Sequence, residues 1–125
     1  MEDDKFYELV DLYRNPEHYG KPSKYNYSEN GYSPSCGDKF SIYLDVEDGV
    51  VKDASFDGKG CVISTVSLSK LCSFLIGKPL KEIGKMQLKD IENMLGVGDI
   101  SISRVKCATV GLDAIKKINK EVRNN

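Results

Sequence analysis

The cysteines are the residues of this chain with the most distinctive chemistry. There are four of them, at Cys36, Cys61, Cys72 and Cys107. Thiolates are preferred ligands of zinc and of the iron in iron–sulfur clusters. Inside a cell a reducing thiol pool keeps cysteines free, so metal binding or catalysis is favoured over disulfide cross-linking.

Three of the cysteines are expected near the ends of regular structure, where a thiol can be reached. Cys36 lies in a Pro-Ser-Cys-Gly-Asp segment, Cys61 follows the Gly-Lys-Gly of residues 58–60, and Cys107 lies near the start of the last predicted helix. Cys72 falls within an apolar helical stripe, where a cysteine usually acts as a small hydrophobic residue. We therefore take Cys36, Cys61 and Cys107 as candidate ligands and Cys72 as a packing residue.

Asp38 is the candidate for a fourth ligand, because a tetrahedral site takes about four. It is two residues from Cys36 with only Gly37 between them. A carboxylate is a harder donor than a thiolate, so it would make a soft-metal site easier to unload. Asp is also common in loops as a turn or capping residue. The spacing alone therefore does not decide whether Asp38 is a metal ligand or a turn residue. There is no paired C-x-x-C motif of the zinc-ribbon type, so spacing is only a weak metal signal.

The single histidine, His18, is far in sequence from every cysteine. This disfavours a cysteine–histidine catalytic pair, and we interpret His18 as a structural or incidental loop residue. Gly37, Gly58 and Gly60 are expected to allow close backbone approach around the sulfurs, since no phosphate-loop pattern accompanies them.

The elements that position these residues are predicted from the period of the apolar side chains. Residues 5–13 show helical spacing, and residues 18–34, rich in Gly, Pro, Ser and Asn, are predicted to form a loop. Residues 40–46 and 50–56 alternate as half-buried strands, and Asp48-Gly49 between them predicts a hairpin turn.

A short third strand is predicted at 61–63, after which the period becomes helical over 64–76, 88–95 and 103–120. The prediction is an α+β fold with an N-terminal helix, a three-stranded antiparallel sheet and a C-terminal helical layer. At this length we expect residues 1–125 to form a single domain.

The charge is nearly balanced, with a formal net charge of -1. It gives no global field to attract nucleic acid or an anionic membrane. The apolar runs are far shorter than the ~20 residues that span a bilayer, and the acidic start, Met1-Glu2-Asp3-Asp4, lacks the features of a secretory signal. We expect a cytoplasmic protein with no nucleic-acid or membrane partner.

Four motifs follow one another along nearly the whole chain. They are Asn15-Pro16 followed by Gly20, the Ser-Pro-Ser-Cys-Gly-Asp of 33–38, the Gly-Cys-Val-Ile-Ser of 60–64, and the Arg-Val-Lys-Cys-Ala-Thr of 104–109. In this order they resemble the IscU/SufU/NifU N-terminal scaffold family. The resemblance implies that Cys36, Cys61 and Cys107 are cluster ligands and that Asp38 tunes cluster release or binds zinc. It also implies that a cysteine desulfurase supplies persulfide sulfur.

Two departures from the family concern its branches. The IscU branch has His before its last cysteine, whereas this chain has Lys106, as the SufU branch does. The stretch 77–104 looks too short for the insertion that SufU proteins carry. The Leu-Pro-Pro-Val-Lys segment that Hsp70-type chaperones grip in IscU is replaced by residues 101–106, which argues against chaperone-driven release.

Lys106 and Arg104 also have an electrostatic interpretation. Three thiolates and one carboxylate around a divalent ion leave a formal charge of about -2, and nearby cations would stabilise this excess. Lys106 is thus a candidate neighbour of the ligands, with a solvated lysine on a helix face as the alternative.

The leading hypothesis is a non-enzymatic scaffold on which persulfide sulfur and iron form a [2Fe-2S] cluster for transfer to apo-proteins. Any of Cys36, Cys61 and Cys107 could accept the sulfur. The alternative is a SufU-like sulfurtransferase with zinc on the same four residues, and a plain structural zinc domain is a third interpretation.

Overall fold

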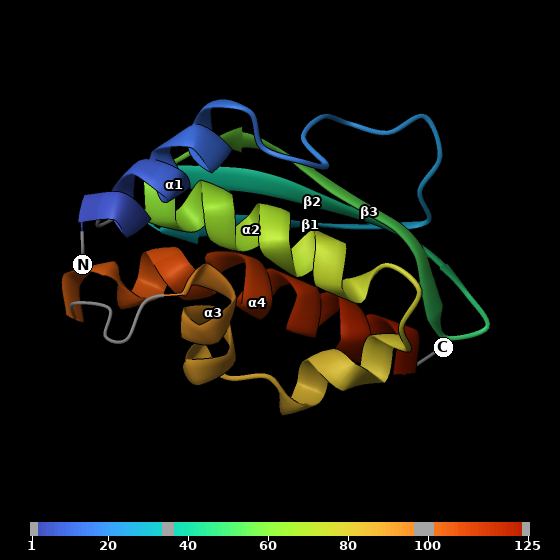
Figure 1. Ribbon diagram of the computed structural model, residues 1–125. Coiled ribbons are helices and arrows are strands. Elements are labelled where there is room, and N and C mark those ends of the chain that lie inside the picture. Colours follow the sequence, from blue (N-terminus) through green and yellow to red (C-terminus); the bar gives the residue numbers. More distant parts are fainter. Residues whose placement is uncertain (1–2, 34–36, 97–101, 124–125) are drawn as a thin grey trace.

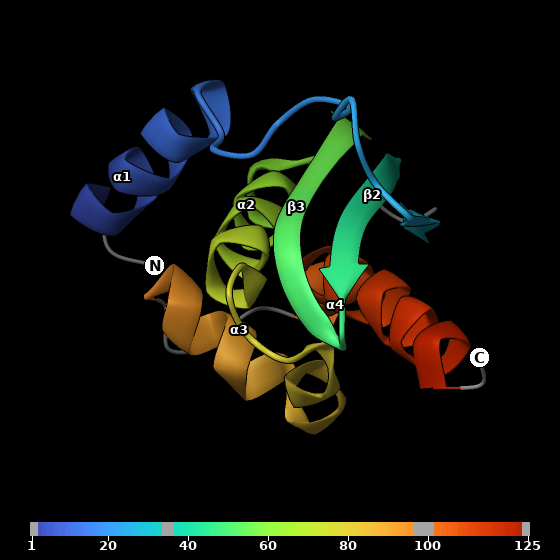
Figure 2. The same ribbon diagram turned by 90° about the vertical axis from the view of Figure 1, so that its right-hand side faces the viewer.

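The computed structural model describes residues 3–33, 37–96 and 102–123, with side chains for 7–33, 37–96 and 105–122. The elements in chain order are α1 (Asp3–Arg14), β1 (Tyr27–Ser33), β2 (Asp38–Glu47), β3 (Val50–Lys59), α2 (Val62–Leu75), the 3-10 helix η1 (Leu80–Lys85), α3 (Leu88–Leu95) and α4 (Ile102–Arg123). Figures 1 and 2 show α2 and α4 against one face of the sheet, with α1 and α3 outside them. The predicted α+β fold is therefore confirmed.

The sheet is antiparallel, in the order β1-β2-β3. The predicted Asp48-Gly49 turn joins β2 to β3. Both residues have positive φ, 53° for Asp48 and 78° for Gly49, as a type I′ hairpin turn requires. The tight turn and the register shift between Asp45 and Val46 together set the register in which Ile42 faces Phe56.

The prediction of a third strand at 61–63 is wrong. β3 continues through the glycine-containing segment to Lys59, and Cys61 is already the N-cap residue of α2. Gly58 allows this continuation, because its φ of 119° and the close approach of the Lys39 carbonyl leave no room for a side chain. The chain therefore passes from strand to helix at Cys61 without a further strand.

The actual third strand, β1, lies inside the segment predicted to be a loop. Its buried positions are Gly31 and Ser33, so it lacks the apolar alternation by which a strand is usually predicted. Gly31 is small for a packing reason, since a Cβ there would lie 2.9 Å from Val110 Cγ2 of α4. Close contact with α4 thus replaces the missing hydrophobic side chains.

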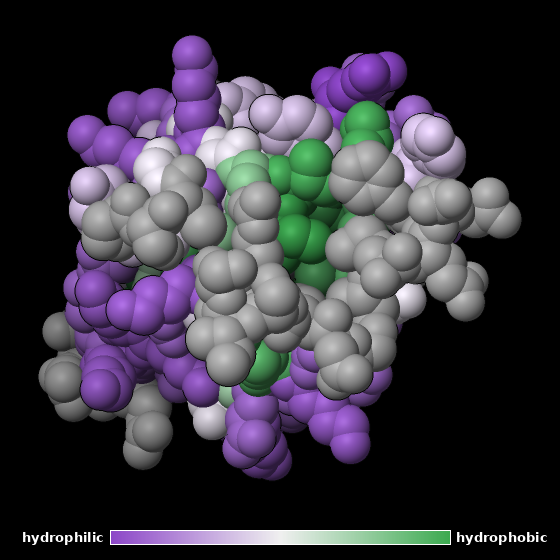
Figure 3. All heavy atoms as spheres, turned by 90° about the vertical axis from the view of Figure 1, so that its left-hand side faces the viewer, coloured by the Kyte–Doolittle hydropathy of each residue, from purple (hydrophilic) through white to green (hydrophobic). Residues whose placement is uncertain are grey.

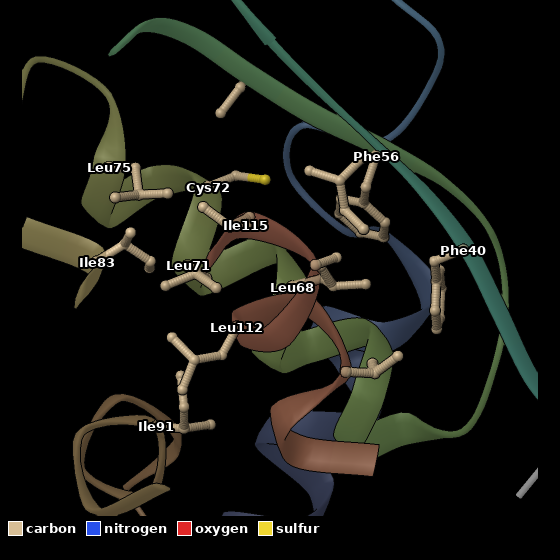
Figure 4. Packing of buried hydrophobic residues seen from close by; sticks show 14 of the residues in the cluster. Phe40, Phe56, Leu68, Leu71, Cys72, Leu75, Ile83, Ile91, Leu112 and Ile115 are labelled. Carbon is tan, nitrogen blue, oxygen red and sulfur yellow. The ribbon is translucent and has the colours of Figure 1, made fainter. Parts of the chain in front are cut away.

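The core lies between the sheet and the helical layer. Figure 4 shows Leu68, Leu71, Cys72 and Leu75 of α2 facing residues from the sheet, from α4, from α3 and from η1. At the crossing of α2 and α4, Gly111 leaves the space that the Leu68 side chain occupies. The two helices therefore pack closely, which fixes their N-terminal ends relative to each other.

Both ends of the outer edge of β3 are covered by other parts of the chain. Phe56 exchanges backbone hydrogen bonds with His18 and Gly20, at 3.0 and 2.7 Å. Val51 does the same with Lys78 and Gly77, at 2.9 and 2.7 Å. These connections hold the loop before β1 and the loop after α2 against the sheet.

Candidate metal centre

Asp38 is the first residue of β2 and is fully buried, with 0% of its surface exposed. Its Oδ1 atom accepts a hydrogen bond of 2.9 Å from the backbone N–H of Cys61. The contact joins the start of β2 to the start of α2, two places that are 23 residues apart in sequence. Asp38 therefore ties two segments together.

The second carboxylate oxygen of Asp38, Oδ2, is also buried but has no hydrogen-bond partner among the described residues. An unpaired buried carboxylate oxygen costs free energy, whereas a cation in contact with it would offset that cost. Carboxylate oxygens are common metal ligands, and Oδ2 is available for this role because the described residues do not use it. The environment of Asp38 thus fits a metal ion.

Cys61 presents its sulfur at the N-terminus of α2. As the N-cap residue, it accepts a hydrogen bond through Sγ from the backbone N–H of Ser64 at 3.5 Å, and Ser64 Oγ lies 3.5 Å from the same sulfur. The positive end of a helix dipole favours negative charge at such a place. The thiol is free and half-buried, so it is partly open to solvent.

Cys107 lies in the second turn of α4 and is 0% exposed. The expectation that it would be reachable is therefore wrong, because this face of α4 packs into the core beside Ala108. Cys107 is disulfide-bonded in the structure, so a role as a thiolate ligand applies to the reduced protein.

The ligand atoms of Asp38, Cys61 and Cys107 all lie within 4.8 Å of one another. Metal–ligand distances of about 2.0–2.3 Å put neighbouring ligand atoms of a tetrahedral zinc site roughly 3.5–3.8 Å apart. Small side-chain adjustments would therefore allow these three groups to hold one ion. Cys36, the fourth predicted ligand, lies outside the described residues.

The N-terminal ends of α2 and α4 lie at the left of Figure 1, beside the start of β2. Figure 3 faces this side of the molecule, and hydrophobic side chains gather in the middle of the face it shows. The candidate metal centre is therefore at the end of the molecule where β2 and the two central helices begin.

The other residues considered from sequence have varied positions. Lys106 is exposed on α4, next to the buried Cys107, and the side chain of Arg104 lies outside the described residues. His18 is hydrogen-bonded through Nε2 to Ser73 Oγ at 2.9 Å, a structural contact. Cys72 is 0% exposed in the core, as its apolar stripe predicts.

Ser64 was not singled out from the sequence. Its contacts with Cys61 depend on Cys61 being a helix N-cap, and the strand prediction at 61–63 hid that role. The spacing Cys-x-x-Ser, with a polar residue three positions after a capping residue, is the signal that could have revealed it.

The fold and the clustered acid and thiols define an α+β protein with a candidate metal centre near the start of its central helices. Residues 5–123 match the family described as the NifU-like N terminal domain. The chain belongs to this family. This confirms the resemblance on which the sequence interpretation relied.

Two curated relatives show the range of the similarity. The iron-sulfur cluster assembly scaffold protein IscU of Thermotoga maritima is 32% identical over 130 residues, covering 91% of this chain and 91% of the relative. The zinc-dependent sulfurtransferase SufU of Bacillus subtilis is 28% identical over 134 residues, covering 94% and 90%. The chain is therefore similar to both branches.

Solved structures support the fold. A nitrogen-fixing NifU-like protein (N-terminal) from Brucella abortus has a TM-score of 0.78 at 18% identity, covering 98% of this chain and 97% of that one. A putative iron-sulfur cluster assembly scaffold protein for the SUF system from Fervidobacterium islandicum has a TM-score of 0.71 at 26% identity, covering 87% and 91%. Among the described residues, none of the helices is long and apolar enough to cross a bilayer.

Proposed function

We propose that this protein is a single-domain scaffold that assembles a [2Fe-2S] cluster on Cys36, Cys61 and Cys107, beside Asp38, and passes it to apo-proteins. The observation that carries the proposal is the convergence of Asp38, Cys61 and Cys107 within 4.8 Å, with one buried carboxylate oxygen lacking a partner among the described residues. Membership of the NifU-like family and similarity to an IscU scaffold support it.

The chemistry of the residues follows from their donor types. A thiolate of the site attacks the outer sulfur of the desulfurase persulfide, and the desulfurase cysteine leaves as a thiolate. Each sulfur delivered in this way takes two electrons from an external reductant to become sulfide. Thiolates suit the iron, while the harder Asp38 carboxylate binds it less strongly and so favours release.

The test is anaerobic incubation of the reduced protein with ferrous iron, cysteine, a cysteine desulfurase and a dithiol reductant. We expect the visible absorbance of a cluster, followed by its transfer to apo-ferredoxin. Cys61→Ala should abolish assembly. The matched control is Cys72→Ala, which removes a buried thiol outside the site and should assemble as the parent does. Assembly by Cys61→Ala at the parental level would contradict the proposal.

Asp38→Ala tests the role of the carboxylate in release. Without the hard oxygen donor, we expect the cluster to form but to transfer more slowly than from the parent protein, because only the softer, tighter thiolate ligands remain. The measurement is the rate of transfer to apo-ferredoxin from preloaded protein. A rate equal to or above that of the parent would show that Asp38 does not promote release.

A second candidate function is a zinc-dependent sulfurtransferase, favoured by Lys106 before Cys107 and by the similarity to SufU. In that case the protein would keep zinc, stay colourless in the same incubation and accelerate the desulfurase. Metal analysis of freshly purified protein, together with desulfurase turnover, separates the two functions. Chaperone-driven release is not part of either proposal.

A further inference from the structure

We propose that Gly60 is a positioning residue of the metal centre: the space left by its missing side chain holds the Asp38 carboxylate against Cys61 and thereby sets the affinity for a thiophilic divalent metal. The inference deepens the proposed function, because it concerns the same site.

The evidence is the crowding around the Cα atom of Gly60. A Cβ atom placed there would lie 2.5 Å from Ser64 Oγ, 2.6 Å from Asp38 Oδ1 and 2.6 Å from Phe40 Cε2. These separations are far inside van der Waals contact. Gly60 is not among the glycines with positive φ, so the restriction comes from its neighbours and not from its backbone conformation.

The three neighbours differ in their freedom to move. Phe40 is 1% exposed and packs against Phe56 with ring centroids 5.9 Å apart, so its ring is fixed by the core. Ser64 Oγ could rotate, at the loss of its 3.1 Å hydrogen bond to the Cys61 carbonyl. Asp38 Oδ1 is the end of a side chain, so it is the group that an added methyl would displace.

Displacing Asp38 Oδ1 would affect two ligands at once. The oxygen accepts the 2.9 Å hydrogen bond from the Cys61 N–H, and Cys61 in turn presents its sulfur at the start of α2. Groups that orient metal ligands typically contribute 10–100-fold to affinity. A single methyl group at Gly60 should therefore weaken metal binding by that amount.

The experiment measures the zinc affinity of the reduced protein by competition with a chelator. We expect Gly60→Ala to bind zinc 10–100-fold more weakly than the parent. Gly84→Ala is the matched control, because Gly84 also lacks a positive φ and a Cβ there would meet only Asn119 Nδ2, at 3.7 Å. This variant should bind zinc as the parent does.

Cobalt spectra and a double variant test whether Gly60 acts through Asp38. With Co²⁺ in place of zinc, Gly60→Ala should keep the thiolate-to-cobalt charge-transfer bands and show the d–d bands of Asp38→Ala. In Asp38→Ala, the additional Gly60→Ala change should alter zinc affinity less than twofold. The melting temperature of each metal-free variant monitors the fold.

Two results would overturn the inference. One is a Gly60→Ala protein with parental zinc affinity, and the other is an equal loss from Gly60→Ala with and without Asp38, which would assign the effect to Phe40 or Ser64. If Gly60→Ala does not fold, the double variant with Asp38→Ala should recover folding, because the added methyl group can occupy the space that the carboxylate has left. A double variant that also fails to fold would overturn the inference. Parental zinc binding without cluster assembly would contradict the proposed function alone.

Discussion

At the residue scale, the two oxygens of Asp38 differ in their surroundings. Oδ1 is bonded to the Cys61 N–H, whereas Oδ2 has no partner among the described residues. A protonated acid in this place would bury an unpaired donor, and a carboxylate buries an unpaired acceptor. In the proposed function, a bound cation would pair with the carboxylate oxygen and remove this cost.

Cys72 gives a prediction at the same scale that does not depend on metal. Burial and, to a smaller extent, the negative charge of Asp53 together raise the pKa of the Cys72 thiol from 9.0 to about 12. Between these values the unfolded chain loses the proton while the folded protein keeps it. The stability linked to Cys72 is therefore full below pH 9 and is lost as the pH rises toward 12.

The measurement is denaturant unfolding of the reduced parent and of Cys72→Ala across this pH range. The difference between their free energies of unfolding should shift steadily in favour of the variant as the pH rises. Because lysine and tyrosine titrate in both proteins, only the difference is informative. A difference that does not change with pH would contradict the raised pKa.

The sequence could predict which residues form the site more readily than how they are held. Asp38, Cys61 and Cys107 stand in motifs that resemble a known family, and the structure brings their ligand atoms together. The role of Gly60 depends on a contact with Asp38, 22 positions earlier in the chain, so no local pattern specifies it. The role of Ser64 depends on Cys61 being the N-cap of α2, and the local Cys-x-x-Ser spacing indicates it only once that helix start is known. Close packing is a property of the folded chain.

At the element scale, the strongly patterned segments were predictable and the weakly patterned strand was not. β2 and β3 alternate clearly and share an Asp-Gly turn, and α4 carries a continuous apolar stripe. β1 buries Gly31 and Ser33, so tertiary contact with α4 and pairing with β2 decide its conformation. Local propensity is overridden where burial involves backbone and small side chains.

The crossing of α2 and α4 provides an element-scale prediction. Gly111→Ala improves helix propensity by about 1 kcal/mol, but its methyl would overlap Leu68 of α2. We expect overpacking to dominate and to destabilise the protein by about 1–3 kcal/mol in denaturant unfolding.

The control for overpacking is to provide room on the other helix. Leu68→Ala destabilises the parent by leaving a cavity, but in that background Gly111→Ala should lower the free energy of unfolding much less than it does in the parent. As a separate control, the free energy of unfolding of Gly84→Ala should stay within about 0.5 kcal/mol of the parent. Equal costs of Gly111→Ala with and without Leu68 would show that the two side chains do not compete for the same space.

At the scale of the whole molecule, the candidate metal centre takes its residues from β2, α2 and α4, so we expect an ion bound there to stabilise the entire fold. Free zinc at a hundredfold excess over its dissociation constant contributes about 2.7 kcal/mol, which raises the melting temperature of a domain of this size by roughly 10 °C. A chelator should reverse the shift. The shift should shrink as the pH falls, because protons compete for the thiolates and the carboxylate.

The measurement is thermal unfolding of the reduced protein with zinc and with chelator, for the parent, Cys61→Ala and Cys72→Ala. Cys72→Ala should retain the zinc-dependent shift, and Cys61→Ala should lose most of it. A full shift in Cys61→Ala would place the stabilising ion elsewhere on the protein.

The covered edge of β3 has a consequence for how copies of this chain meet. The backbones of Val51 and Phe56 are already hydrogen-bonded to neighbouring loops. The stretch of β3 between them, residues 52–55, is too short to pair with a strand from another molecule. An incoming strand would have to add beside β1. Intermolecular sheet growth, the first step of aggregation for many β-containing proteins, is thereby limited to one side of the sheet.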